Sequence, residues 1–176
     1  MINLTGKELN NLIKRLQDGD MAVFDSIYYE TNSLVFYTIL SIVKDKSLAE
    51  DLMQDCYLKA LQKIHSFKPR YSFKSWIVVI ARNLAINEYN RRKKELSFDP
   101  SVDDYIFGVS ESNSEKELLV KEMIEKLDPI EREIVLLHVV GDLKHREIAD
   151  IVKKPLGTVT WLYNKAIKKL KEEFGE

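Results

Sequence analysis

Residues that form turns and cross-links are scarce in this chain. Its 176 residues include only 6 glycines and 4 prolines, about half of what average usage of about 7% and about 5% would give. Sandwiches and barrels made only of strands need such residues about every 8–12 positions, so this scarcity argues against an all-β fold. The single cysteine, Cys56, excludes an intrachain disulfide and a cysteine-rich zinc site.

Long apolar runs are absent as well. No stretch reaches the roughly 18 residues that span a bilayer, and the N-terminus has no basic patch followed by an apolar core. We therefore expect a cytoplasmic protein with no membrane insertion. Hydrophobic residues at 45% and charged residues at 31% are typical of a folded chain. The length allows one compact domain or two small ones.

Charge is nearly balanced overall, with a formal net charge of −1, but it is unevenly distributed. Residues 68–94 hold eight basic residues against one acidic residue, and residues 144–171 hold eight against two. Residues 99–117, between them, hold six acidic residues against one basic residue. Two basic segments separated by an acidic one fit two sites for nucleic acid. They fit ordinary solvated helix faces equally well.

Apolar residues recur at helical spacing along most of the chain, which predicts an all-α protein. The expected helices span residues 7–17, 21–43, 48–65, 76–94, 115–126, 129–140, 144–152 and 158–174. Ser47 is expected to cap the third helix, with Glu50 completing a capping box. The pattern dissolves at 95–114, so we expect a flexible acidic linker there between a domain at 1–94 and a second domain at 115–176.

An acidic strip marks the expected helix at 48–65. Asp51, Gln54 and Asp55 share one face, and Leu58 follows a turn later. This face is either a docking strip for a basic partner or an ordinary wet face whose acids favour the helix dipole.

The loop expected at 66–75 alternates aromatic with basic residues. The aromatic residues in and just after it are Phe67, Tyr71, Phe73 and Trp76, and the basic ones are Lys68, Arg70 and Lys74. Aromatic rings beside cations suit unpaired bases, although Phe73 and Trp76 are also explained as plain core. The polar face of the following helix presents Asn83, Asn87, Asn90, Arg91 and Lys94.

The C-terminal part has the pattern of a helix-turn-helix DNA reader, with a short helix, a turn that contains Gly157, and a second helix rich in polar and basic residues. Opposite its buried stripe, the last helix carries Thr158, Thr160, Trp161, Asn164, Lys165 and Lys168. Threonine and tryptophan can contact thymine methyl groups, asparagine can bond adenine, and lysine can hold phosphates. An amphipathic helix in an unrelated bundle would show the same pattern.

Catalytic constellations are missing from the sequence. Asp51 and Asp55 share one helix turn, yet no histidine or glutamate spacing completes a metal site with them, and the 3 histidines are scattered. There is no glycine-rich phosphate loop and no nucleophile elbow. We therefore expect no enzyme activity, no catalytic residue, no metal and no cofactor.

Three sequence motifs follow one another along the chain. They are Ala49-Glu-Asp-Leu-Met-Gln-Asp-Cys-Tyr-Leu-Lys59, then Phe73-Lys-Ser-Trp-Ile-Val-Val-Ile-Ala-Arg-Asn-Leu-Ala-Ile-Asn87, then Leu127-Asp-Pro-Ile-Glu-Arg-Glu-Ile-Val-Leu-Leu137 with Glu147-Ile-Ala149 and Pro155-Leu-Gly-Thr-Val159. Together they resemble bacterial RNA polymerase sigma factors of the small, two-domain extracytoplasmic-function (ECF) type of the sigma-70 family. The likeness covers about residues 20–94 and 115–172. It implies a protein that directs core polymerase to specific promoters and opens the minus-ten element, while the polymerase catalyses the reaction.

The resemblance also implies roles for residues. Asp51, Gln54, Asp55 and Leu58 would dock on the clamp helices of the largest polymerase subunit. The minus-ten element would be melted and read by Phe67, Lys68, Arg70, Tyr71, Lys74, Trp76, Arg82, Asn83, Asn87, Asn90 and Arg91. The second domain would bind the polymerase flap and read the minus-thirty-five element with Arg146, Thr158, Thr160, Trp161, Asn164, Lys165 and Lys168. The free chain would be a monomer, and an anti-sigma factor is a further candidate partner.

One three-residue segment and one single residue depart from the family pattern. Thr160-Trp161-Leu162 stands where many relatives have a basic residue followed by Ser-Arg, which bears on the sequence of the minus-thirty-five element. Lys144 replaces a capping serine or threonine, which predicts a helix start weaker by about 1 kcal/mol.

We also expect the two domains of the free chain to pack together and cover DNA-binding faces.

Two other functions fit part of the sequence. A helix-turn-helix repressor or activator would bind duplex DNA as a dimer without polymerase, although no long apolar seam remains for a dimer. A scaffold whose helices bind only protein would tolerate replacement of Asn87 and Lys165.

Overall fold

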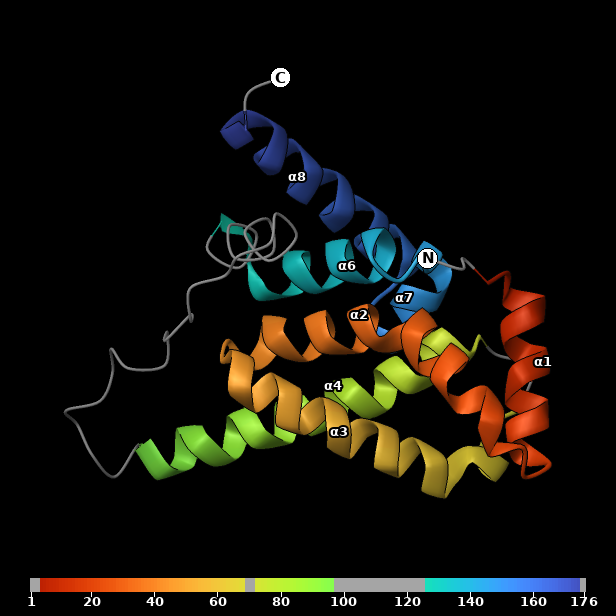
Figure 1. The fold of residues 1–176 in the computed structure, drawn as a ribbon. Helices are drawn as coiled ribbons and strands as arrows, with labels where there is room; N and C mark the ends of the chain where they lie inside the picture. Colours follow the sequence, from red (N-terminus) through yellow and green to blue (C-terminus); the bar gives the residue numbers. More distant parts are fainter. Residues whose placement is uncertain (1–3, 69–71, 97–125, 175–176) are drawn as a thin grey trace.

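The protein is described by a computed structural model that covers residues 4–68, 72–96 and 126–174. Its helices are α1 (Gly6–Gln17), the 3-10 turn η1 (Met21–Val23), α2 (Phe24–Val43), α3 (Lys46–Lys63), the 3-10 turn η2 (Ile64–Ser66), α4 (Phe73–Leu96), α6 (Pro129–Val139), α7 (His145–Val152) and α8 (Leu156–Phe174), as Figure 1 shows. These described ranges contain no strand, which confirms the predicted all-α class. None of the helices described is long and apolar enough to cross a membrane.

The first domain consists of α1 to α4. Helices α2, α3 and α4 pack against one another, and α1 closes one end of the bundle (Figure 1). Their shared core contains Val35, Ile39, Ala49, Cys56, Ile77 and Ala81, which have no exposed surface. These residues recur at helical spacing, so burying them on one stripe favours helices here.

The second domain consists of α6, α7 and α8. Helix α6 begins as predicted, with Asp128 at the N-cap, Pro129 in the first turn, and the Glu131 carboxylate accepting a hydrogen bond from the Asp128 backbone N–H at 3.3 Å. Helices α7 and α8 are joined by a tight turn in which Lys153 is left-handed, with φ of 54°. This is the predicted helix-turn-helix arrangement.

Three predicted boundaries are wrong. Asp45, not Ser47, caps α3 by accepting a hydrogen bond from the Leu48 backbone N–H at 2.9 Å. The reason is that Lys44 ends α2 in the left-handed conformation, which leaves a single residue before α3 begins. Helix α4 starts at Phe73, inside the expected loop, and α8 starts at Leu156 rather than 158. Most of the expected linker and of the expected helix at 115–126 lies outside the described residues.

The two domains pack against each other, in agreement with the expectation for the free chain. Helix α6 lies on α2, and α7 contacts α4 (Figure 1). Leu34 of α2 and Val78 of α4 are buried in the same apolar cluster as Leu137 of α6. A β-carbon on Gly141 would lie 2.8 Å from Cδ1 of Leu34, so glycine permits this close approach.

Candidate nucleic-acid and protein interfaces

Four residues form what we name the acidic ridge of α3: Asp51, Gln54, Asp55 and Leu58. All four are exposed, and Leu58 is 59% exposed although the residues on the opposite face of the helix are buried. Asp51 and Asp55 form no ion pair with any described residue. Free carboxylates around an exposed leucine complement a basic partner that also offers an apolar contact. Docking by this ridge stays a prediction.

Phe67 belongs to the core rather than to a DNA-binding surface. It is 3% exposed, and its ring centroid lies 5.5 Å from that of Phe73 and 5.6 Å from that of Trp76. Because a buried ring cannot stack on a base, this placement corrects the predicted DNA contact of Phe67. The buried Phe73 also fits the core interpretation, whereas Trp76 is half-buried and Lys68 is exposed.

Arg70 and Tyr71 lie outside the described residues, so their predicted contacts with DNA stay predictions.

Two basic residues predicted to bind DNA are held by carboxylates from distant parts of the chain. Lys74 pairs with Glu30 of α2 at 2.8 Å, and both side chains are largely buried. Arg82 of α4 pairs with Glu133 of α6, which belongs to the other domain. Neither cation is available to a phosphate unless its carboxylate partner moves away.

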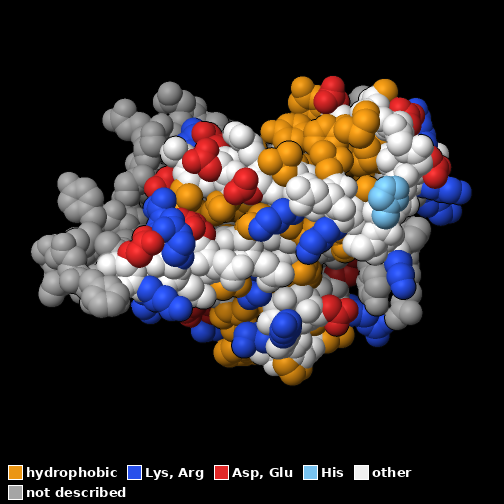
Figure 2. Space-filling model, turned by 90° about the horizontal axis from the view of Figure 1, so that it is seen from below, with side chains coloured by type: hydrophobic (Ala, Val, Ile, Leu, Met, Phe, Trp, Pro, Cys, Tyr) orange, Lys and Arg blue, Asp and Glu red, His pale blue; other side chains and the backbone are white. Residues whose placement is uncertain are grey.

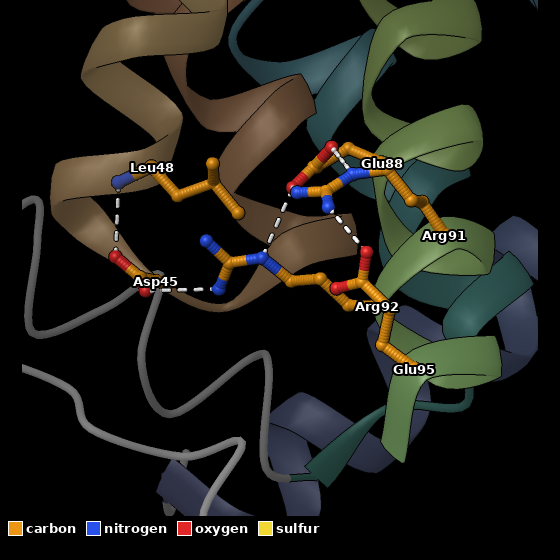
Figure 3. Close-up of polar contacts among 6 residues, drawn as sticks. All are labelled: Asp45, Leu48, Glu88, Arg91, Arg92 and Glu95. Carbon is orange, nitrogen blue, oxygen red and sulfur yellow. Dashed lines mark hydrogen bonds and ion pairs between the residues drawn. The ribbon is translucent and has the colours of Figure 1, made fainter. Parts of the chain in front are cut away.

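The C-terminal turns of α4 carry an ion cluster (Figure 3). Glu88 accepts hydrogen bonds from Arg91 at 2.7 Å and from Arg92 at 3.0 Å. Arg91 also donates to Glu95 at 2.6 Å, and Arg92 donates to Asp45 at 3.5 Å. The hydrogen bond from Arg91 is the main reason why the pKa of Glu88 lies below its usual value. Since the arginines are exposed, exchanging these carboxylates for phosphates costs little.

Figure 2 shows the same mixing of charge on the surface, where basic and acidic side chains lie beside one another on the face seen from below. Among the described residues, that face therefore carries no uninterrupted positive surface.

Asn83, Asn87 and Asn90 form what we name the amide row of α4. Their spacing places them along one side of the helix, all three are exposed, and none bonds to a described residue. Val79, one turn before Asn83, is 41% exposed. The sequence analysis did not single out Val79. Its position outside the helical stripe of Ile77, Ala81 and Ala85 indicated that its side chain would be exposed.

Helix α8 presents an exposed stripe to solvent. Thr158, Trp161, Asn164 and Lys168 are exposed, and Trp161 is 60% exposed. Arg146, at the start of α7, is exposed and forms no ion pair with the residues that the structure describes. The stripe has the chemistry for reading a major groove, and its tryptophan is unusually open to solvent.

Thr160 and Lys165 lie on the same helix but are already engaged. The Thr160 hydroxyl is 3.3 Å from Nδ1 of His145. Lys165 Nζ is 2.7 Å from the buried Glu131 carboxylate and 5.3 Å from the centroid of the Trp161 ring. Burial raises the pKa of Glu131, but hydrogen bonds from Lys165 and Lys169 more than offset this, so its pKa lies below the usual value. Lys165 therefore orients Trp161 as much as it offers a charge to phosphate.

Both domains match models of known protein families. The chain matches the family model described as Sigma-70 region 2 over residues 28–95 and the model described as Sigma-70, region 4 over residues 117–170. It is 29% identical to the ECF RNA polymerase sigma factor SigM of Bacillus subtilis over 132 residues, covering 73% of this chain and 80% of SigM. It is 28% identical to the ECF RNA polymerase sigma factor BldN of Streptomyces coelicolor over 166 residues, covering 90% of this chain and 63% of BldN.

The fold is similar to that of the sigma factor RpoE from Bartonella quintana, solved in complex with the anti-sigma factor NepR. The TM-score is 0.73 at 23% identity, covering 85% of this chain and 94% of that one. The two family models together span more than half of the chain, in the order that the sequence predicted. The chain therefore belongs to the sigma-70 family and is an RNA polymerase sigma factor of the ECF type, a promoter-specific transcription initiation factor that binds core RNA polymerase and promoter DNA.

Proposed function

We propose that this sigma factor docks on core polymerase through the acidic ridge of α3, reads the opened minus-ten element with the amide row of α4, and reads the duplex minus-thirty-five element with α8. The observation that carries this proposal is the amide row, because three exposed amides without partners among the described residues are ready to read base edges. The polymerase supplies the chemistry, so the chain has no catalytic role in this proposal. We expect it in the cytoplasm, with the polymerase.

The docking role is tested by in vitro transcription with core polymerase. Asp51→Ala/Asp55→Ala should lower the affinity for core polymerase and the yield of transcript by about tenfold or more, as removal of interface hot spots does. Asp18→Ala/Asp25→Ala removes two exposed carboxylates, one at the C-cap of α1 and one in the first turn of α2, and serves as the matched control. Equal activity of the two double variants would contradict the docking role.

The reading of the minus-ten element is tested by replacing the amide row. Asn83→Ala/Asn87→Ala should leave binding to core polymerase unchanged and reduce strand opening, measured by permanganate reactivity of unpaired thymines. Asn11→Ala, on the exposed side of α1, is the control. Unchanged opening by the α4 variant would mean that these amides do not read the element.

Membership of the sigma-70 family argues against the two other functions that fit part of the sequence. These are a helix-turn-helix repressor or activator that binds duplex DNA as a dimer without polymerase, and a scaffold that binds only protein.

A further inference from the structure

The side chain of Gln17, the last residue of α1, ties this helix to the segment that leads into α4. Gln17 Nε2 donates to the Ile64 carbonyl at 2.7 Å and to the Phe67 carbonyl at 3.1 Å. Both partners are carbonyl oxygens, which only accept, so the amide nitrogen must face them. The bonded residues are 47 and 50 positions apart. One side chain therefore holds the first residue of η2 and the residue that ends it.

Helix α1 is well placed to hold this segment, because the helix is itself anchored. Its buried residues lie in the same apolar cluster as Phe67, and α1 contacts both η2 and α4 (Figure 1). At its start, Thr5 and Glu8 form a capping box, in which the Glu8 carboxylate accepts from the Thr5 backbone N–H at 2.7 Å. A helix fixed at its start and along its buried side presents Gln17 in a defined position.

Phe67 is held through its ring and through both of its backbone polar groups. The buried ring packs against two aromatic rings of α4. The Phe67 backbone N–H donates to the Ile64 carbonyl at 3.1 Å, and its carbonyl accepts from Gln17. The peptide bond that joins Phe67 to Lys68 therefore has little freedom to reorient.

Lys68, at the end of this fixed segment, is exposed and forms no ion pair with a residue in the described ranges. The other basic residues that are expected at the minus-ten element and lie in those ranges have carboxylate partners. These partners are Glu30 for Lys74, Glu133 for Arg82, and Glu88 for Arg91. Within that set, Lys68 is the cation that can bind a phosphate without first losing a carboxylate.

We propose that Gln17 is a positioning residue for the opened minus-ten strand, because by holding the Phe67 carbonyl it fixes the backbone from which Lys68 binds a phosphate. A lysine on an ordered backbone loses less conformational freedom on binding than one on a loose segment. Gln17 itself does not touch DNA. This inference rests on the proposed function and deepens it, since Lys68 serves the same strand as the amide row of α4.

The test measures the affinity of the full chain for a fluorescein-labelled oligothymidine by fluorescence anisotropy. Lys68→Ala should weaken binding and lower the slope of log K against log salt by about 0.7, the value for one phosphate contact on a single strand. Gln17→Met removes both donors from a side chain of similar length without a change of charge. It should weaken binding by about two- to tenfold, which corresponds to the ordering of one flexible side chain.

The double variant Gln17→Met/Lys68→Ala separates positioning from a general loss of structure. It should bind no more weakly than Lys68→Ala alone, because both substitutions act on one contact. Gln62→Met, at an exposed glutamine of α3, and Ile13→Val, which loosens the core of α1 but leaves both donors in place, should bind like the wild type. A far-ultraviolet circular dichroism spectrum identical to that of the wild type shows that each variant is folded.

Three results would overturn the role of Gln17. They are wild-type affinity of Gln17→Met, wild-type affinity of Lys68→Ala, and additive losses in the double variant. The proposed function fails separately. If Asn83→Ala/Asn87→Ala opens the minus-ten element normally while the losses here are not additive, the reading by the amide row is refuted and the role of Gln17 stands.

Discussion

Single residues show how much of a predicted DNA surface is already engaged within the protein. Glu131 has no exposed side chain and holds two lysines of α8, at 2.7 Å for Lys165 and 2.6 Å for Lys169. A carboxylate in this position orders one face of α8, the helix that we propose to read DNA. Its removal strands two cations next to the core, although both lysines keep partial contact with water.

Glu131→Ala should therefore destabilise the second domain by about 1–3 kcal/mol, less than for a fully buried pair because the lysines are partly exposed. Urea denaturation followed by circular dichroism measures this loss. Glu173→Ala removes an exposed partner of Lys126 and should cost less than about 1 kcal/mol. Equal losses for the two variants would show that burial of Glu131 contributes nothing.

Because of Glu131, the stability of the second domain should depend on pH. The pKa of this carboxylate is lower in the folded protein than in the unfolded chain, so its stabilisation is complete above the unfolded value of about 4.3 and is lost as the pH falls through the folded value. The stability difference between wild type and Glu131→Gln should be larger at pH 7 than at pH 3. A difference that does not change with pH would contradict this assignment.

Helix α4 carries two surfaces that were predicted to contact DNA, the amide row and the ion cluster of Figure 3. Alternation of aromatic and basic residues before α4 suggested one stacking surface, but Phe67 and Phe73 are buried, so there the alternation reflects core and solvent sides of the chain. The amides remain exposed and bond to no described residue. Several cations of α4 are already paired with carboxylates, either of α4 itself, as Arg91 is with Glu88 and Glu95, or of other elements, as Lys74 is with Glu30 and Arg82 with Glu133.

Glu88→Gln removes the carboxylate that Arg91 and Arg92 share and should make both arginines more available to phosphates, while Glu95 and Asp45 remain as their other partners. Non-specific binding to single-stranded DNA should strengthen, and the slope of log K against log salt should steepen by about 0.7 for each added phosphate contact. Glu50→Gln removes an exposed carboxylate of α3 and should leave both quantities unchanged. Fluorescence anisotropy at several salt concentrations makes the comparison.

For helix α8, the prediction concerns its exposed tryptophan, Trp161. Trp161→Ala should leave stability within about 0.5 kcal/mol of wild type, because the side chain is exposed, and should weaken protection of the minus-thirty-five element in footprinting of the holoenzyme. Val139→Ala, an equally exposed apolar residue on α6, should leave the footprint intact. Weakened protection by both variants would point to a general loss of structure.

At the scale of the whole molecule, periodicity predicted the elements but not their partners. The helical stripes, the N-cap of α6 at Asp128 and the helix-turn-helix follow from neighbours in sequence, where the physical rules act locally. The ion pairs that hold Lys74 and Arg82 join residues 44 and 51 positions apart, and no local pattern reports such pairing. The Ser47 cap failed for a related reason, since the left-handed Lys44 decided where the next helix begins.

The apolar contacts between the two domains also affect how readily the free protein self-associates in concentrated solution. Separation of the two domains would expose Leu34 and Val78, which are now fully or almost fully buried, to water together with the side of α6 that faces them. Exposed apolar faces of this kind promote self-association. A population of molecules with separated domains is therefore expected to be prone to aggregation.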